Sequence, residues 1–287
     1  MTIRRLRRGE RGYPVLLGQI PDPPASLWLR GEADVDLLSA PAVAIVGARA
    51  CSGYGRSVAR LLANEVSAAG AVVVSGLARG IDGEAHRGAL AAGGRTVAVL
   101  GCGVDRDYPA AHAELARSIV ATAGLVVSEY EPGVEPAPWR FPARNRIIAG
   151  LARATVVVEA RERSGALITA DFALEDGREV LAVPGEITSA LSAGTNELLR
   201  LGATPVTCAT DVLEAIGLEA RPAAPALPEG PHLAAVIDAL TGGVGTVDEL
   251  ARATSLPAAT VAAALVELEL AGAVTVEEGV VRSTIAR

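Results

Sequence analysis

The chain contains no lysine: all 26 basic residues among its 287 residues are arginine. This absence excludes the GxxxxGK(S/T) phosphate loop, in which a lysine contacts the phosphates of a nucleoside triphosphate. It also excludes mechanisms that need a lysine Schiff base, such as pyridoxal phosphate chemistry.

Cysteine is also scarce, and the three that are present, Cys51, Cys102 and Cys208, do not have the spacing of metal ligands. Their odd number suits a chain that folds in a reducing compartment without disulfides. No apolar run is long enough to span a membrane, and the N-terminus lacks the apolar core of a signal peptide. We therefore expect a cytoplasmic protein with no metal site and no cofactor.

Aromatic residues make up only 3% of the chain, whereas 50% of its residues are hydrophobic, so the core must consist mainly of alanine, valine and leucine. The formal net charge is −7 and the isoelectric point is about 5.2. An acidic chain of this kind has no general attraction for nucleic acid, but its arginines can still form a local basic site.

Short apolar runs alternate with helical patterns through most of the chain. Six runs are typical of buried strands, at residues 43–47, 71–74, 96–101, 125–128, 155–159 and 180–183. Repeated alternation of strand and helix indicates a parallel sheet with helices on both faces. We therefore predict an α/β fold with a Rossmann-like, doubly wound and mostly parallel sheet.

The turn that follows the second of these strands has the features of an anion-binding position. Ser75 and Gly76 turn the chain, and Asp82 stands where a helix N-cap belongs. A glycine turn leading into a helix N-terminus presents unpaired backbone N–H groups to an anion. Arg79 adds a positive charge with forked donors. The alternative is an ordinary tight connection in a parallel sheet.

At least one arginine follows each of the first five strands. The carboxyl ends of parallel strands lie at one edge of the sheet, where ligands bind in open α/β folds. The arginines in these segments are Arg49, Arg79, Arg106, Arg140, Arg144, Arg146, Arg161 and Arg163. The same loops also carry Asp105, Asp107, Glu129, Glu131, Glu135 and Glu162. We therefore predict a site for a ligand with several phosphates on an edge of mixed charge.

Two features of these loops have competing explanations. Trp139 and Phe141 flank Arg140, and their rings are either stacking platforms for bases or a buried lid over the sheet. Asp82 and His86 lie four residues apart on one helix, where they form either a metal or acid–base pair or a cap and a packing histidine. The second explanation is favoured for Asp82 and His86 because no third ligand is evident.

Composition divides the chain into four segments. Residues 1–42 are an arginine-rich tail with a lead-in segment; the tail can contact nucleic acid, but we expect it to be solvated and disordered. Residues 43–217 are the Rossmann-like domain. Residues 218–231 are rich in proline and alanine, as in a semi-rigid linker. Residues 232–287 contain three short helical patterns and a hairpin, which predict a winged helix.

The predicted winged helix is acidic, with three arginines against seven acidic residues. Its expected recognition helix carries Glu267 and Glu269 and no basic residue, whereas a helix that reads duplex DNA needs positive contacts to phosphate. We therefore interpret it as a protein-contact or inherited module. Residues 242–249 resemble the PGGxGTxxE motif of phosphoribohydrolases of the cytokinin-activating type, but a helix cap at Thr246 is the simpler explanation.

Seven motifs occur in a family-specific order. They are Tyr13-Pro14, the turn at 22–24, Val46-Gly47-Ala48-Arg49, residues 75–90, residues 141–151 (FPARNRIIAGL), residues 164–170 (SGALITA) and Val183-Pro184-Gly185. Together they resemble the DNA-processing protein A family (DprA, also called Smf). The resemblance extends from Tyr13 to about Ile216 and includes the C-terminal winged helix that many members carry.

The resemblance implies a non-catalytic protein of natural transformation that binds single-stranded DNA, protects it and loads the recombinase RecA. It implies a Rossmann-like fold that forms a homodimer through residues 186–203, where Leu198, Leu199 and Leu201 are expected to be exposed on a lone subunit. It implies no catalytic residue, metal or cofactor. The predicted DNA-binding residues are Arg49, Ser52, Gly53, Ser75, Gly76, Arg79, Arg140, Phe141, Arg144, Asn145, Arg146, Ser164 and Gly165. Arg140 is the candidate replacement for a lysine of the family.

Two other functions remain as alternatives. A nucleotide-binding or nucleotide-cleaving enzyme on the same sheet, of the phosphoribohydrolase type, requires a catalytic carboxylate among the loops at the strand ends. A winged-helix transcription regulator requires a basic recognition helix, which the sequence lacks.

Overall fold

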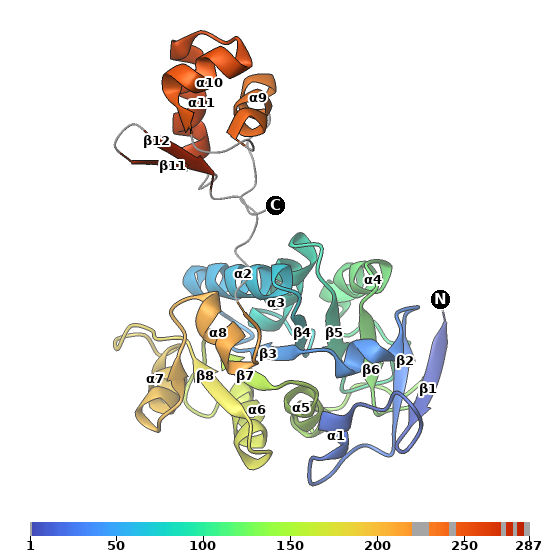
Figure 1. Cartoon of the computed structure of the whole chain (residues 1–287). Coiled ribbons are helices and arrows are strands. Elements are labelled where there is room, and N and C mark those ends of the chain that lie inside the picture. Colours follow the sequence, from blue (N-terminus) through green and yellow to red (C-terminus); the bar gives the residue numbers. More distant parts are fainter. Residues whose placement is uncertain (1, 220–229, 241–244, 271–273, 278–279, 284–287) are drawn as a thin grey trace. The chain divides into compact units, whose positions relative to one another are not determined.

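The computed structural model describes residues 2–219, 230–240, 245–270, 274–277 and 280–283 (Figure 1). The chain divides into two compact units, residues 1–221 and 222–287. In the described part of the chain, no helix is both long enough and apolar enough to cross a membrane.

The first unit is built on one nine-stranded sheet, in the order β1-β2-β6-β5-β4-β3-β7-β8-β9. Its parallel strands are β3 (Ala42–Val46), β4 (Val72–Ser75), β5 (Thr96–Val99), β6 (Leu125–Ser128), β7 (Ala154–Val157), β8 (Glu179–Ala182) and β9 (Thr204–Pro205). Strands β1 (Ile3–Arg7) and β2 (Ser26–Arg30) add an antiparallel edge. The predicted Rossmann-like, mostly parallel α/β fold is confirmed.

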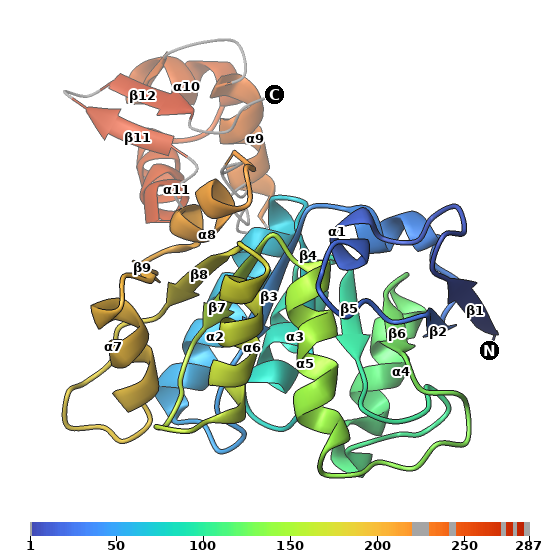
Figure 2. The same ribbon diagram turned by 90° about the horizontal axis from the view of Figure 1, so that it is seen from below.

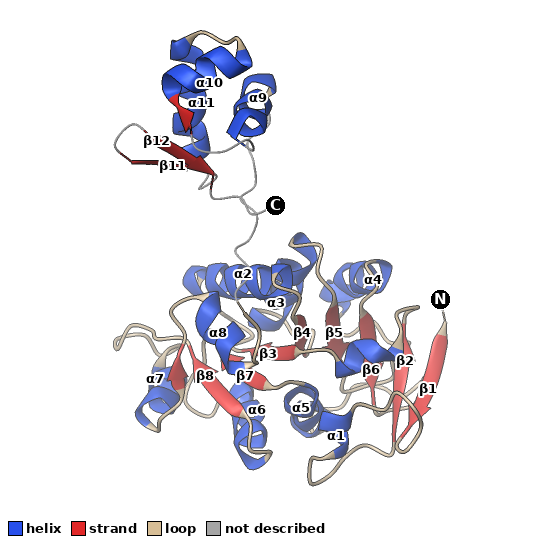
Figure 3. Ribbon diagram, in the orientation of Figure 1, coloured by secondary structure: helices blue, strands red, loops and turns tan. Residues whose placement is uncertain are grey.

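Helices cover both faces of this sheet (Figures 1 and 3). On one face lie α2 (Gly53–Ala68), α3 (Ile81–Ala91), α4 (Ala113–Ala121) and α8 (Ala209–Ala215). On the other lie α1 (Val15–Gly18), α5 (Arg140–Leu151) and α6 (Gly165–Glu175), which Figure 2 shows in front of the strands. The remaining helices are α7 (Ala193–Arg200), next to β8, and the 3-10 turns η1 (Val35–Ser39) and η2 (Ala110–His112).

Strand β3 is apolar at every position because both of its faces are buried. In β3, Ala44 and Val46 pack in the cluster that contains the apolar residues of α5 and α6. Val43 and Ile45, which alternate with them, pack in the cluster on the α2 side. A strand with two buried faces therefore loses the alternating pattern of a half-exposed strand, as the sequence shows at residues 43–47.

Strand β3 occupies the point where the strand order reverses. The chain runs outward from β3 through β4 and β5 to β6, and then returns to place β7 on the other side of β3. The connections from β3 and β7 therefore leave the sheet on opposite faces, which opens a crevice at their carboxyl ends.

The N-terminal segment corrects the expectation of a disordered tail. Ile3–Arg7 forms the edge strand β1, paired with β2 along its whole length, and Leu6 is buried. The guanidinium of Arg5 lies 5.4 Å from the centre of the Trp28 ring, and Arg4 donates a hydrogen bond to the carbonyl of Ala33. The expectation was wrong because a distant strand supplies the hydrogen-bonding partners that a charge pattern cannot reveal.

The second unit is the predicted winged helix. It contains α9 (Pro231–Leu240), α10 (Val247–Thr254) and α11 (Ala258–Leu270), with the short strands β10 (Gly245–Thr246), β11 (Val274–Glu277) and β12 (Val280–Ser283) in the order β10-β12-β11. Its own core includes Leu233, Val236, Leu250, Val261 and Leu268.

In the part of the 242–249 motif that the structure describes, Thr246 caps the start of helix α10. The Thr246 hydroxyl accepts a hydrogen bond from the Glu249 N–H, and the Glu249 carboxylate accepts one from the Thr246 N–H. This reciprocal capping box confirms the simpler explanation of the motif. Gly242 and Gly243 lie outside the described residues.

Candidate functional site

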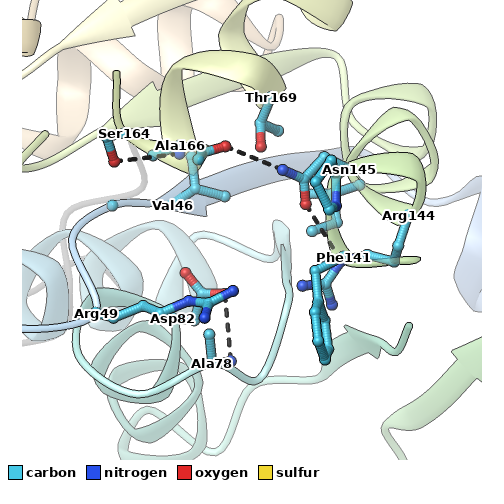
Figure 4. A pocket seen from close by; sticks show the side chains of 14 residues that line it. Val46, Arg49, Ala78, Asp82, Phe141, Arg144, Asn145, Ser164, Ala166 and Thr169 are labelled. Atoms are coloured by element: carbon cyan, nitrogen blue, oxygen red, sulfur yellow. Dashed lines mark hydrogen bonds between the residues drawn. The ribbon is translucent and has the colours of Figure 1, made fainter. Parts of the chain in front are cut away.

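Two adjoining pockets lie at the carboxyl edge of the sheet. The first has a volume of about 240 Å³ and is lined by the turn after β3, the start of α3, the start of α5 and the start of α6 (Figure 4). The second has a volume of about 570 Å³ and extends to the loop after β5. Both are lined by Arg49, Ala78, Phe141 and Arg144. This is the crevice that the strand order creates.

Arg49 is the exposed cation common to the two pockets. Its guanidinium lies 5.5 Å from the centre of the Phe141 ring, which holds the charge at the boundary between the pockets. In the described part of the chain, no carboxylate forms an ion pair with Arg49. Arg79 is likewise exposed and lines the second pocket. Both side chains have donors that can reach a ligand phosphate.

Arg144, in contrast, is only 4% exposed. It donates hydrogen bonds to the carbonyl of Gly76, at 2.8 Å, and to the carbonyl of Val99. Burial lowers the pKa of Arg144 to about 10, and the nearby charge of Asp82 opposes this decrease. Because a buried guanidinium must have its donors satisfied, we assign Arg144 first to joining the end of β5 to the turn after β4. Arg144 also lines both pockets, so its predicted contact with DNA stays a prediction.

Asp82 is buried beside Arg144 and accepts hydrogen bonds from the N–H groups of Gly76, at 3.1 Å, and Ala78, at 3.3 Å. Burial raises its pKa, and the charge of Arg144 opposes that change. A Cβ on Gly76 would lie 2.6 Å from both Arg144 Nη2 and Asp82 Oδ2. Gly76 is therefore required because two charged side chains pack against its α-carbon.

Arg146 is also engaged within the protein. It donates two hydrogen bonds to the Glu129 carboxylate, at 2.8 and 2.7 Å, and one to Asp22 at 3.1 Å. The bonds to Glu129 raise its pKa, and its side chain is only 12% exposed. This compensated charge argues against the phosphate contact predicted at Arg146.

The start of α6 is open toward the first pocket. Ser164 caps the helix by accepting a hydrogen bond from the Ala166 N–H, at 3.3 Å, and Gly165 is exposed. Asn145 donates to the carbonyl of Gly165, at 3.0 Å, and accepts from the side chain of Arg144, at 3.3 Å. Asn145 thus holds α5 and α6 together. The Leu167 N–H donates to the Ser164 carbonyl, at 3.0 Å, which leaves the N–H of the exposed Gly165 as the donor that can meet an anion.

Two other predicted residues, Ser75 and Ser52, have structural partners. Ser75 is fully buried and donates to the carbonyl of Ile45, at 2.7 Å, which ties β4 to β3. Ser52 and Gly53 lie at the start of α2, where Ser52 caps the helix by accepting from the Gly55 N–H at 3.0 Å. Ser52 also contacts Glu159, a buried residue beyond the end of β7 that the sequence did not single out.

The aromatic residues separate into two environments. Phe141 is half-buried and stacks on Tyr108, with ring centres 5.3 Å apart. Trp139 is 71% exposed, so it is not a buried lid, and it does not line either pocket. Arg140 lies over the Tyr130 ring at 4.9 Å. Phe141 is therefore the ring that lines both pockets, and Tyr108 also lines the second.

Asp82 and His86 point to different partners. His86 is fully buried and shares a hydrogen bond of 2.7 Å with the Thr96 hydroxyl, while burial lowers its pKa to about 3. Its ring therefore packs in neutral form between α3 and β5. Within the described residues, no three histidine, cysteine or carboxylate side chains are placed to hold a metal ion.

The segment predicted to form a dimer interface is only partly exposed. Leu198 is 8% exposed and packs in the main core, so its predicted exposure is wrong. Leu199 is partly buried against the same cluster. Leu201 is 76% exposed and Ile187 is 95% exposed. The error at Leu198 arose because one face of α7 packs against β8, which the sequence alone does not reveal.

Family models match both units. The model described as DNA recombination-mediator protein A matches residues 4–217, and the model described as DprA winged helix domain matches residues 219–279. A putative DNA processing protein DprA of Mycobacterium tuberculosis is 46% identical over 264 residues, which cover 89% of this chain and 68% of that protein.

Solved structures show the same similarity. DprA from Streptococcus pneumoniae superimposes with a TM-score of 0.70 at 44% identity, covering 75% of this chain and 74% of that one. DprA from Helicobacter pylori, described for its single-stranded DNA binding mode, superimposes with a TM-score of 0.65 at 30% identity, covering 75% of this chain and 96% of that one.

Proposed function

The chain belongs to the DNA recombination-mediator protein A family (DprA, also called Smf), and we propose that it binds single-stranded DNA in the crevice between β3 and β7. The observation that supports this most is the combination of an exposed Arg49, the open start of α6 and the Phe141 ring around adjoining pockets. Single strands are generally held in this way, with cations and N–H groups on the phosphates and aromatic rings on the bases.

The proposed binding does not depend on base sequence. Arg49, Arg79 and the α6 N-terminus can meet phosphates, and phosphate contacts position a strand without reading it. The wider acidic surface is compatible with this because several carboxylates are already paired, as Glu129 is with Arg146 and Glu135 with Arg106. In each pair the arginine neutralises the carboxylate, so that carboxylate repels a strand less than an unpaired one would.

We further propose that the protein acts in the cytoplasm during natural transformation, where it shields the incoming strand and transfers it to the recombinase RecA without catalysing a reaction. A nucleotide-cleaving enzyme would need a carboxylate free to act as a base. Asp82, the buried carboxylate of the first pocket, is instead held by two backbone N–H groups.

An electrophoretic shift experiment tests the binding proposal. A single-stranded oligonucleotide should be retarded at lower protein concentration than the duplex of the same sequence, with no nucleotide added. If the duplex binds equally well or better, the crevice is not a single-strand site.

Replacing Phe141 by alanine should weaken single-strand binding by about 1–3 kcal/mol, the usual value of one base stacked on an aromatic ring. The dependence of affinity on salt should not change, because no phosphate contact is lost. Fluorescence anisotropy at several salt concentrations measures both quantities. Trp139→Ala is the matched control and should bind like the parent, because Trp139 does not line either pocket. An equal loss in both variants would exclude a specific role for Phe141.

Removing residues 218–287 should leave most of the single-strand affinity intact. The first unit has its own core and contains the whole crevice, and helix α11 carries Glu267 and Glu269 with no basic residue. The comparison is an anisotropy titration of the truncated and full chains, after circular dichroism has shown that the truncated chain is folded. A large loss in a folded truncated chain would mean that the winged helix contacts DNA.

We also propose a homodimer formed through residues 186–203. Ile187 and Leu201 are large apolar side chains exposed on the first unit, and exposed apolar surface of this kind commonly marks an interface. Sedimentation velocity at micromolar concentration should show a dimer for the parent and a monomer for Leu201→Asp. A parent that remains monomeric would contradict the proposal.

A further inference from the structure

Helix α2 begins at the position where Rossmann-like folds bind the phosphates of a nucleotide. In those folds the pyrophosphate of a dinucleotide lies at the N-terminus of the helix that follows the first parallel strand. Here β3 is that strand, and the 16-residue helix α2 follows it after a turn that ends in Ser52 and Gly53. The first turn of α2 is therefore the anion position that the fold itself provides.

This position is filled by a side chain of the protein. The Glu159 carboxylate accepts a hydrogen bond from the Ser52 backbone N–H, at 2.9 Å through Oε2, and another from the Ser52 hydroxyl through Oε1. Glu159 is only 4% exposed. Its own carbonyl accepts from the Ala48 N–H at 2.7 Å, which fixes the residue against the turn after β3.

The neighbouring glycines fit Glu159. A Cβ on Gly55 would lie 2.4 Å from the carboxyl carbon of Glu159, and a Cβ on Gly47 would lie 2.9 Å from its backbone oxygen. In a dinucleotide site such glycines let the backbone approach a pyrophosphate. In this protein they let the backbone approach a glutamate.

The charge of Glu159 is balanced by the helix. Within the described residues no arginine forms an ion pair with Glu159, whereas the half-buried Glu129 is paired with Arg146. A buried carboxylate without a cationic partner is stabilised by hydrogen bonds and by the positive end of a helix dipole. At the start of α2, Glu159 has both the hydrogen bonds and the positive end of the helix dipole. A bound phosphate would be stabilised there in the same way.

We propose that Glu159 is a specificity-determining residue, a resident anion that closes the α2 N-terminus to external phosphates. It excludes the diphosphate of a free nucleotide from the position where the fold would bind it. The crevice around Arg49 and the start of α6 then remains as the position that is open to anions. This statement about the crevice rests on the proposed function.

A cavity of about 490 Å³ adjoins the carboxylate and is lined by Ser52, Tyr54, Glu159, Gly185 and Ser192, among others. A diphosphate could therefore enter from solvent if the carboxylate were absent. Glu159 is thus the group that keeps this position closed.

The test measures pyrophosphate binding to the full-length protein by isothermal titration calorimetry. Glu159→Ala exposes the Ser52 N–H and hydroxyl, and it should bind pyrophosphate roughly ten- to a hundredfold more tightly than the parent, as expected for regained hydrogen bonds to a charged group. Glu175→Ala, which removes an exposed glutamate from the last turn of α6, is the matched control and should behave like the parent. A folded Glu159→Ala that gains no affinity over the parent would overturn the proposal.

Two further measurements keep the result decisive. Glu159→Ser opens the same position with a smaller polar side chain, and the same comparison applies if Glu159→Ala does not fold. On the parent itself, the amide NMR signals of Ser52 and Gly53 should not shift when pyrophosphate is added, and a shift there would also overturn the proposal. Failure of the proposed function is seen separately, as absence of single-strand binding by the parent.

Discussion

The Arg49→Ala variant is expected to bind single-stranded oligothymidylate roughly ten- to a hundredfold more weakly than the parent, the usual value of a hydrogen bond to a charged group. Arg49 is exposed, lines both pockets and has no carboxylate partner among the described residues, so its charge is available to a phosphate. The log–log dependence of affinity on salt should also become shallower by about 0.7, the contribution of one phosphate contact on a single strand.

Anisotropy titrations at several salt concentrations measure both effects. Arg95→Ala is the matched control, because Arg95 is exposed and directly precedes β5, at the opposite edge of the sheet from the crevice. It should leave affinity and salt dependence unchanged. If Arg49→Ala and Arg95→Ala behave alike, Arg49 does not contact the phosphate backbone.

The Arg144→Met variant should lose about 3–5 kcal/mol of unfolding free energy, the usual cost of removing one partner from buried charged groups. The substitution removes the hydrogen bonds to the carbonyls of Gly76 and Val99 and leaves Asp82 buried without its neighbouring charge. For a domain of this size the loss corresponds to a decrease in melting temperature of roughly 6–20 °C. Scanning calorimetry of the first unit's transition measures it.

Arg117→Met provides the comparison for stability. Arg117 is 63% exposed, and among the described residues its ion pair is with Glu114 on the same helix, so its removal should cost less than about 1 kcal/mol. One combination of stability and binding results would assign Arg144 a different role. If Arg144→Met melts like the parent but no longer binds single strands, Arg144 is a direct DNA contact, as its motif alone would suggest.

Local patterns in the sequence were enough to predict six parallel strands of the sheet and the edge at which the two pockets lie. Apolar runs that end in glycine turns mark the parallel strands, and parallel topology then brings their carboxyl ends to one edge. The stretch at 75–90 and the start of α6 could be placed at that edge before any contact was known. The winged helix could be predicted for the same reason, since its elements are short and continuous in sequence.

The roles of the individual arginines could not be predicted in this way. Arg49, Arg144 and Arg146 look equivalent in the sequence, because each follows a strand in a loop rich in arginine. The structure separates them through residues that are distant along the chain. The carbonyls of Gly76 and Val99 engage Arg144, and the Glu129 carboxylate engages Arg146, while Arg49 stays exposed.

The edge strand β1 and the buried Leu198 were missed for a related reason. Most side chains of Ile3–Arg7 are charged, and only pairing with β2 makes this segment a strand. Leu198 lies in a short helix whose buried face depends on its packing beside β8. Contacts between segments far apart in sequence decided both cases, and such contacts leave little trace in local composition.

The most direct test of the binding site is hydrogen exchange with and without a single-stranded oligothymidylate, followed by mass spectrometry of the full-length protein. Ser164 accepts hydrogen bonds from the Ala166 and Leu167 N–H groups, and the N–H of the exposed Gly165 is open to a ligand, so a phosphate bound at the start of α6 should slow exchange there. We expect protection in peptides that contain residues 47–51, 76–80 and 164–167, and no change in those from residues 247–270. Protection confined to residues 247–270, with the crevice unchanged, would contradict this account.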